Sequence, residues 1–387
     1  MHKKTTFAQV LEKENERKVK KIASKLPSWA EVPGIQLPDL LPIEQCSSSL
    51  TADFKARFLA RSLPLTLSVA DLTGGFGADS WSLAQQFSSL YYFEQNSALF
   101  ETTRHNLMLL KEKFGTACEM HFSNETVTGE SIKALGKVDC IYIDPARRSL
   151  SGSKVFLLED CTPNVLELLP TISEVSPFLL IKCSPMADIT MLRERLSSAM
   201  PDYPVRGIGV IGIKDEVKEV LVLCGRESLD IPELFVADVT LPEITALPLS
   251  KPVSRVADSI SGQYLLEPNA LILKSGCQDV CCELWAARKC APSCHIYLCD
   301  EKPQGDMARY YKTFEVIEIK DYNKSSLKEV AAAYPVCEVS AKALPVRSEE
   351  LARSLKVKSG IAEDGSHYHV FALGTAKGKK LIVGRHL

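Results

Sequence analysis

The sequence predicts an α/β fold in which helices cover both faces of a mostly parallel sheet. Short apolar runs alternate with helical stretches between residues 66 and 182, which is typical of parallel sheets. The end of this region differs, because the apolar runs VRGIGVIGI and EVLVLC are separated only by the short charged segment KDEVK. Such a short connection joins antiparallel neighbours, so we expect an antiparallel last strand.

Length and composition indicate a soluble protein with more than one domain. The chain has 387 residues, of which 45% are hydrophobic and 24% charged. Its net charge of −2 gives no overall basic signature of nucleic-acid binding. Because no apolar run is long enough for a membrane span or resembles a signal peptide, we expect a cytoplasmic location without a membrane partner. The 13 cysteines are then expected to be reduced thiols.

The elements expected along the chain divide it into four parts. A helical N-terminal region covers residues 1–63, with helices at 7–26 and 49–63, and the α/β domain covers 64–228. Residues 229–265 are rich in Pro and Leu and are interpreted as a linker to a small α/β unit that ends at 317, and a final domain covers 318–387. The expected strands of the α/β domain are 66–70, 90–93, 118–122, 138–143, 178–182 and the final hairpin, and its helices are 79–87, 98–113 and 155–169.

The segment VADLTGGFGADSW follows the first expected strand and has the pattern of a ligand-binding loop. A strand, the acid Asp71, a glycine loop and a helix come in that order, at the sheet edge where open parallel sheets bind ligands. A P-loop is excluded because no G-K-[ST] follows. Asp71 would repel a pyrophosphate, so a dinucleotide oxidoreductase is the weaker alternative. An acid here suits a cationic ligand, or one that carries hydroxyl and amine groups.

This arrangement resembles motif I of the class I S-adenosylmethionine-dependent methyltransferases, whose fold is a Rossmann-like seven-stranded sheet with an antiparallel last strand. The resemblance implies S-adenosyl-L-methionine as the cofactor. The chain departs from the motif at Thr73, which replaces the usual first glycine, and Gly74 is additional. Glu94 ends the second strand in LYYFEQN, and the family's acid at this place binds both ribose hydroxyls. The implied cofactor-binding residues of these two strands are Asp71, Thr73, Gly75, Gly77 and Glu94.

Three more cofactor contacts are implied by neighbouring segments. The stretch EQCSSSLT resembles the motif that precedes the first strand in amino-group methyltransferases, which would place Gln45 and Ser47 near the methionine part of the cofactor. The alternative is that a serine here only caps the following helix. After the third strand, Asn124 is expected near the adenine, with Glu125 as the second choice.

The segment YIDPARR has the place of motif IV, where these enzymes hold the substrate amine. Asp144 and Pro145 match the family's Asp-Pro, so the resemblance implies a catalytic corner in which a carboxylate and a carbonyl accept the amine protons. The second proline and the aromatic residue of the family are absent, and Arg147 and Arg148 are expected to contact the substrate instead, since a guanidinium can stack on a base or bind phosphate. The alternative is that Asp144 only starts a turn before proline.

Two cysteine features allow other interpretations. Cys183 follows Lys182 in LLIKCSPM and resembles the nucleophile of RNA cytosine-C5 methyltransferases, although a buried structural thiol is the more ordinary interpretation. Residues 277–299 hold six cysteines and His295, but no C-x-x-C pair, so we expect core thiols and no metal. The six are Cys277, Cys281, Cys282, Cys290, Cys294 and Cys299.

The order of parts over most of the chain resembles a bacterial family of class I methyltransferases with a helical leader, a ferredoxin-like part up to 317 and a THUMP-like domain at 318–387. The stretches that carry this resemblance include DLTGGFGADS, YIDPARR and YLLEPNALILKSG. It implies methylation of a base nitrogen in structured RNA such as tRNA or rRNA. The alternatives are a small-molecule substrate or a non-catalytic protein that binds RNA or nucleosides. Basic residues expected near phosphates are Arg347, Arg353, Lys356, Lys358, Lys377, Lys379, Lys380 and Arg385.

Overall fold

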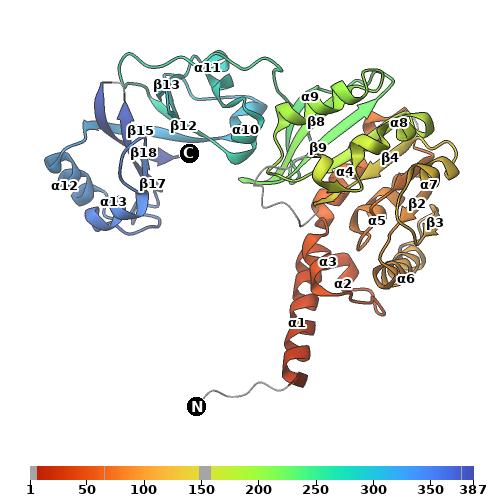
Figure 1. Cartoon of the computed structure of the whole chain (residues 1–387). Helices are drawn as coiled ribbons and strands as arrows, with labels where there is room; N and C mark the ends of the chain where they lie inside the picture. The colour runs from red at the N-terminus through yellow and green to blue at the C-terminus, as the bar shows by residue number, and fades with distance from the viewer. Residues whose placement is uncertain (1–6, 65, 148–157, 376) are drawn as a thin grey trace. The chain divides into compact units, whose positions relative to one another are not determined.

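A computed structural model describes residues 7–64, 66–147, 158–375 and 377–387 of the chain. The chain divides into two compact units, Met1–Ala246 and Leu247–Leu387 (Figure 1). Each unit is built around its own sheet, and the site described below lies entirely in the first unit.

The first unit contains a nine-stranded sheet with the order β11-β10-β8-β9-β7-β4-β1-β2-β3. The strands β3, β2, β1, β4 and β7 run parallel, and β9 is antiparallel to both of its neighbours, β7 and β8. The predicted α/β fold with an antiparallel last strand is therefore confirmed. The bounds are β1 Ser68–Asp71, β2 Ser89–Phe93, β3 Glu119–Ser123, β4 Cys140–Ile143, β7 Phe178–Cys183, β8 Val205–Ile213 and β9 Glu216–Gly225.

Helices of the first unit begin and end at residues whose side chains or backbone suit those places. Ser48 caps α4 and Asn96 caps α6, each by accepting a hydrogen bond from a backbone N–H of the first turn. Gly115 ends α6 in the left-handed conformation. The helices are α1 Phe7–Lys25, α2 Pro27–Ala30, α3 Leu40–Gln45, α4 Ser49–Ser62, α5 Ala78–Ala84, α6 Ser97–Phe114, α7 Gly129–Ala134, α8 Val165–Val175 and α9 Ile189–Ala199.

Two apolar clusters hold the N-terminal helices onto the sheet. Phe58 and Leu59 of α4 pack in one cluster with Val69 of β1. Ile22 of α1 and Leu107 of α6 belong to the other, in which they surround buried residues of α3 and of the glycine loop. The N-terminal region is therefore part of the first unit and brings the segment before α4 to the sheet edge that carries the loop.

The first unit contains the helices α2, α3, α7 and α9, which were not predicted, and it departs from the predicted elements at two other places. The expected linker contains β10 Leu234–Asp238 and β11 Thr245–Ala246, because the apolar run LFVAD is buried against the free edge of β8. The helix expected at 155–169 begins only at Val165, after the 3-10 turn η1 Leu158–Asp160 and the short strand β6 Cys161–Thr162. Pro163 disfavours a helix in the residue before it, which explains the late start. The expected residues 155–157 lie outside the described part of the chain.

The second unit contains one seven-stranded sheet with the order β13-β14-β12-β15-β18-β17-β16. The predicted limit between residues 317 and 318 falls inside β15 Tyr311–Asp321, whose first half pairs with β12 and whose second half pairs with β18. The two predicted C-terminal parts thus share one sheet. The other elements are β12 Tyr264–Pro268, α10 Ala270–Ser275, η2 Gln278–Val280, α11 Cys281–Leu284, β13 Arg288–Ala291, β14 Cys294–Cys299, η3 Asp306–Tyr310, α12 Lys324–Ala333, β16 Glu338–Lys342, α13 Ser348–Leu355, β17 Tyr368–Thr375 and β18 Gly378–His386.

The cysteines are free thiols, and all except Cys46 are buried. The six cysteines of residues 277–299 lie in the interior of the second unit. Among the described residues, no group of three or more His, Cys, Asp or Glu side chains is placed to hold a metal ion. In the same part of the chain, none of the helices combines the length and the apolar character needed to cross a membrane.

Candidate active site

The glycine loop between β1 and α5 is shaped by contacts that exclude larger side chains. A Cβ atom at Gly74 would lie 2.0 Å from the ring of Tyr92. Gly77 has φ +83°, and a Cβ there would lie 2.7 Å from Thr103. Tyr92 and Thr103 in turn donate hydrogen bonds of 2.6 and 2.9 Å to the carbonyl of Gly75. The additional glycine of the loop therefore allows β2 to pack closely beneath it.

Replacing Gly74 with alanine should destabilise the chain, because the new methyl group has no space beside the Tyr92 ring. Overpacking of this kind costs about 1–3 kcal/mol of unfolding free energy. Gly129→Ala is the matched control, since its Cβ meets only the Thr171 hydroxyl, at 3.3 Å. Urea unfolding of the two variants and the wild type measures the effect. Equal stability of both variants would contradict the packing described here.

Asp71 supports this loop from beneath. Its carboxylate is buried and accepts hydrogen bonds from the Thr73 N–H, at 3.1 Å, and from the Ser80 hydroxyl, at 2.5 Å. Burial raises the pKa of Asp71 to about 7, although the bond from Ser80 acts in the opposite direction. Asp71 therefore connects the two ends of the loop. A direct contact between its carboxylate and a ligand stays a prediction.

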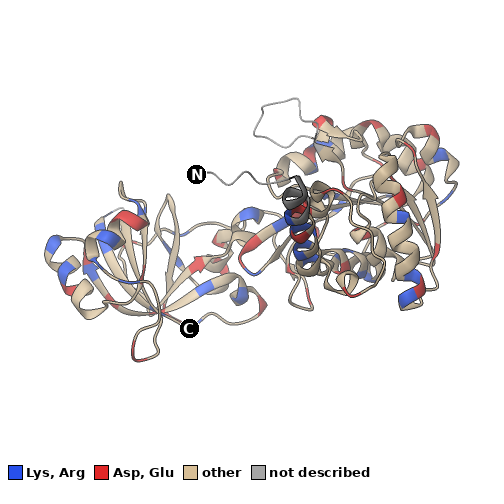
Figure 2. Ribbon diagram, turned by 90° about the horizontal axis from the view of Figure 1, so that it is seen from below, with Lys and Arg blue, Asp and Glu red and all other residues tan. Residues whose placement is uncertain are grey.

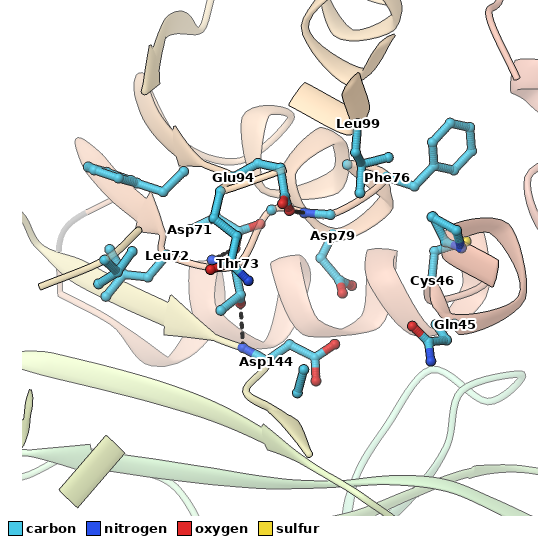
Figure 3. Close-up of a pocket in the computed structure, with 18 of the residues that line it drawn as sticks. Gln45, Cys46, Asp71, Leu72, Thr73, Phe76, Asp79, Glu94, Leu99 and Asp144 are labelled. Atoms are coloured by element: carbon cyan, nitrogen blue, oxygen red, sulfur yellow. Dashed lines mark hydrogen bonds between the residues drawn. The ribbon is translucent and has the colours of Figure 1, made fainter. Parts of the chain in front are cut away.

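Glu94, at the end of β2, lies on the open side of the loop (Figure 3). Its two carboxylate oxygens accept the N–H groups of Gly75, at 3.1 Å, and Asn96, at 2.7 Å. Asn124 donates to the Glu94 backbone carbonyl and accepts from the hydroxyl of Ser97. These bonds hold the Glu94 carboxylate in one orientation, and each oxygen keeps capacity for a further donor.

A cavity of about 640 Å³ lies in front of the loop, at the carboxyl ends of the parallel strands. This volume is within the range of about 300–1,000 Å³ of small-molecule sites. Figure 3 shows Glu94 and Asp144 on different walls of it, with Gln45 and Cys46 on a third. The walls are formed by residues of the α3 region (Pro42, Gln45 and Cys46), the loop 71–79, residues 93–95 and Leu99, residues 125–127, and Asp144, Ala146, Thr162, Pro163, Lys182 and Ser184.

Asp144 follows β4 at the end of the cavity away from Glu94. Its backbone N–H donates to the Thr73 hydroxyl at 2.7 Å, drawn as a dashed line in Figure 3. Its Oδ2 lies 2.6 Å from the Nζ of Lys182, the last residue but one of β7. Burial alone would lower the pKa of Lys182, but the Asp144, Asp79 and Glu219 carboxylates outweigh it and raise that pKa. Lys182 is therefore a permanent cation beside the Asp144 carboxylate.

Behind the cavity wall lies a buried ionic cluster centred on Lys55 of α4. Its Nζ lies 2.7 Å from Glu219 of β9 and 3.1 Å from Asp79 of α5, and it donates to the Ser47 hydroxyl. Asp79 also accepts from Ser47 and from the Tyr142 hydroxyl, both at 2.9 Å, and lies 3.9 Å from the Lys182 ammonium. The cluster therefore ties the segment before α4 to the loop, to β4 and to β9.

The comparisons with known proteins agree with this architecture. The crystal structure of a "putative methyltransferase" from Porphyromonas gingivalis W83 superposes with a TM-score of 0.80 and 27% sequence identity, covering 96% of this chain and 89% of that one. The chain has a methyltransferase fold. In addition, residues 264–305 match a family described as a ferredoxin-like domain. No protein with a curated function matches the chain in sequence.

Two further solved structures resemble part of the chain. TrmK of M. capricolum, in complex with S-adenosyl-homocysteine, covers 46% of this chain and 69% of its own, with 15% identity and a TM-score of 0.33. The crystal structure of a "putative RNA methyltransferase" from Pyrococcus horikoshii covers 53% of this chain and 95% of its own, with 12% identity and a TM-score of 0.34.

On this methyltransferase fold, the residues predicted from sequence fall into three groups. Those that line the cavity are Gln45, Asp71, Thr73, Gly75, Gly77, Glu94 and Asp144. A second group lies just outside the cavity wall. Ser47 is in the buried cluster, Pro145 lines a smaller neighbouring cavity, and Asn124 supports Glu94. Glu125, the second choice for the adenine contact, lines the main cavity. For Arg147 the structure describes only the backbone, in the short strand β5 Ala146–Arg147, and Arg148 lies outside the described residues.

Cys183 has the properties of a structural thiol in this fold. It is 2% exposed, and burial raises its pKa well above the ordinary value of a thiol. A nucleophilic cysteine needs the thiolate form, which burial disfavours. Burial therefore argues against a nucleophilic role for Cys183, and the catalytic role of Asp144 stays a prediction.

Five functional residues near the site were not predicted from sequence, namely Lys55, Asp79, Tyr142, Lys182 and Glu219. Two of them carried a usable signal. Lys55 lies on the apolar side of a predicted helix, and Glu219 begins the otherwise apolar run EVLVLC of a buried strand. A charged side chain at a buried position is paired with an opposite charge in most proteins. The burial expected for Lys55 therefore indicates a buried acid as its partner, and that expected for Glu219 indicates a buried base.

Proposed function

We propose that the chain is an S-adenosylmethionine-dependent methyltransferase that modifies a base nitrogen in structured RNA. The observation that carries the proposal is the pairing of Glu94 and Asp144 on different walls of one cavity, with the glycine loop between them. Glu94 has the fixed carboxylate that a ribose diol requires, and Asp144 has the acceptor that a substrate N–H requires.

The residues of the cavity fit the proposed cofactor. The Glu94 oxygens, oriented by Gly75 and Asn96, would accept the two ribose hydroxyls. Gln45 and the loop would hold the methionine part, and Glu125 and its neighbours the adenine. When bound, the cofactor supplies a methyl group on a sulfonium that is already a good leaving group. The protein then needs mainly to align the substrate nitrogen and to accept its proton.

An RNA substrate is supported by the solvent-facing side of α1. Lys13, Arg17 and Lys20 recur at helical spacing and are exposed, whereas Ile22 on another side of the helix and Leu26 directly after it are buried. Exposed Glu16 also lies on this helix, and over the rest of the molecule Lys and Arg are mixed with Asp and Glu (Figure 2). Two of the basic residues predicted near phosphates are paired, Lys380 with Asp321 and Arg385 with Glu315, and their contact with RNA stays a prediction.

Reversing the charge of Arg17 and Lys20 should weaken RNA binding and leave cofactor binding unchanged. In filter binding of total tRNA to the full chain, the Arg17→Glu/Lys20→Glu variant should lose affinity at low salt. The slope of log K against log salt concentration should be smaller in magnitude by about 1–2 for the variant than for the wild type, because each phosphate contact contributes about 1 to this slope. Arg104→Glu/Lys113→Glu on exposed positions of α6 is the control. If the tRNA affinity of the wild type depends on salt as weakly as that of the variant, a small-molecule substrate is favoured.

A further inference from the structure

The Asp144–Lys182 pair lies where two cavities meet. Asp144, Lys182 and Ser184 line both the main cavity and a neighbouring one of about 240 Å³. The smaller cavity also contains Pro185 and Met186, and Met186 is 72% exposed. These apolar side chains can cover the face of a planar ring. A base held in the smaller cavity would therefore present its edge to the ion pair, with the main cavity on the other side.

The ion pair offers one acceptor and one donor side by side. Asp144 uses Oδ2 for Lys182, at 2.6 Å, and its side chain is 38% exposed, which leaves Oδ1 for a ligand within the described part of the chain. The Lys182 ammonium has three N–H donors, of which the bond to Asp144 uses one. Two kinds of base edge complement this pair. In guanine or uracil an N–H lies next to a carbonyl oxygen, and in adenine or cytosine an amino N–H lies next to a ring nitrogen acceptor. The hydrogen-bonding pattern therefore fits both, and the charges of the pair have to distinguish them.

The charges of the pair distinguish two kinds of methylation. An exocyclic amine that attacks a methyl group develops positive charge, which a neighbouring ammonium opposes. A lactam nitrogen must lose its proton, and the resulting negative charge spreads to the adjacent carbonyl oxygen. A preorganised cation at that oxygen stabilises the transition state in which this negative charge develops. Removal of one such donor typically lowers the rate about 10²–10³-fold.

We propose that Asp144 and Lys182 select a lactam edge, so that the enzyme methylates the ring nitrogen of guanine or uracil in RNA. The inference rests on the proposed function and names its substrate class. In the step, the ring N–H proton passes to the Asp144 carboxylate and the nitrogen lone pair forms the bond to the methyl carbon. The carbon–sulfur bond breaks with its electron pair going to sulfur, which becomes a neutral thioether. Lys182 donates to the carbonyl oxygen throughout and keeps its own proton.

The test combines the product with a Lys182 variant. The full chain is incubated with S-adenosylmethionine labelled in its methyl group and total RNA from a strain that lacks the gene, and the labelled nucleoside is identified by mass spectrometry. The expected product is a guanosine or uridine methylated on the ring nitrogen next to a carbonyl. Lys182→Met should lower kcat about 100-fold. Its rate should rise more steeply with pH than that of the wild type, because alkali removes the lactam proton without help. Lys182→Arg should restore part of the rate.

Calorimetry of S-adenosylhomocysteine binding distinguishes a failure of the lactam inference from a failure of the proposed methyltransferase function. Lys182→Met should bind it as the wild type does, and Lys133→Met, an exposed position on α7, should keep full activity. A methylated exocyclic amine of adenosine or cytidine would overturn the lactam inference and leave the RNA methyltransferase in place. Cofactor binding without transfer to any RNA would overturn both the RNA substrate and the lactam inference. Absence of cofactor binding would overturn the methyltransferase itself.

Discussion

The Lys55→Met variant should lose about 3–5 kcal/mol of unfolding free energy, the cost of leaving buried charges without their partner. Lys55 is 1% exposed and neutralises Glu219, which is 3% exposed, and Asp79, whose side chain is 12% exposed. Methionine retains the apolar stem and removes only the ammonium. Denaturant unfolding of the full chain measures the loss, and a variant as stable as the wild type would show that the cluster contributes nothing.

The loss should depend on pH in a defined direction. Burial raises the pKa of Glu219 even with Lys55 present, and removal of the ammonium should raise it further. A carboxyl whose pKa is higher in the folded than in the unfolded protein contributes stability at low pH, and that contribution is lost as the pH rises through the folded-state value. The Lys55→Met deficit should therefore be smaller at pH 5 than at pH 8. Adding Glu219→Gln should recover part of it at pH 8, since the buried charge is then gone.

The Glu94→Ala variant should bind S-adenosylhomocysteine at least 100-fold more weakly than the wild type. Two ribose hydroxyls lose a charged acceptor, and each hydrogen bond to a charged group contributes about 1.5–3 kcal/mol. The Gly75 N–H also loses its partner, so the loop is held less firmly in its binding conformation. Calorimetric titration of the full chain measures the affinity.

The matched control is Glu101→Ala, which removes an exposed carboxylate from α6 with a side chain 69% exposed. It should bind the cofactor product as the wild type does. Equal affinity of Glu94→Ala and Glu101→Ala would remove the ribose assignment. Unchanged unfolding of Glu94→Ala, measured in parallel, would show that the weaker binding is local.

Local patterns in the sequence were sufficient to predict the fold of the first unit. Apolar runs of four to ten residues define its strands, and the short charged turn near Asp215 predicts the antiparallel end of the sheet. The strand β10 was not predicted, because its five residues lie in a Pro- and Leu-rich segment without a clear period. They form a strand by pairing with the free edge of β8. Likewise, β15 continues from one predicted domain into the next, and pairing between distant segments cannot be read from either segment alone.

The candidate site could be predicted where one residue follows a strand, as Asp71, Glu94 and Asp144 do. Residues that act through a partner were not predictable in the same way. Lys182 becomes part of the site only because β7 lies next to β4, which puts its ammonium beside Asp144. Lys55 meets Glu219 across 164 positions of sequence. Such pairs depend on the packing of the sheet and its helices rather than on any local motif.

The cofactor site can be observed directly in a crystal structure of the full chain grown with S-adenosylhomocysteine. We expect the nucleoside in the cavity in front of the glycine loop, with both ribose hydroxyls within hydrogen-bonding distance of Glu94 and the sulfur on the side of Asp144. A ligand bound elsewhere, or a cavity closed by its own side chains at saturating ligand, would contradict this expectation.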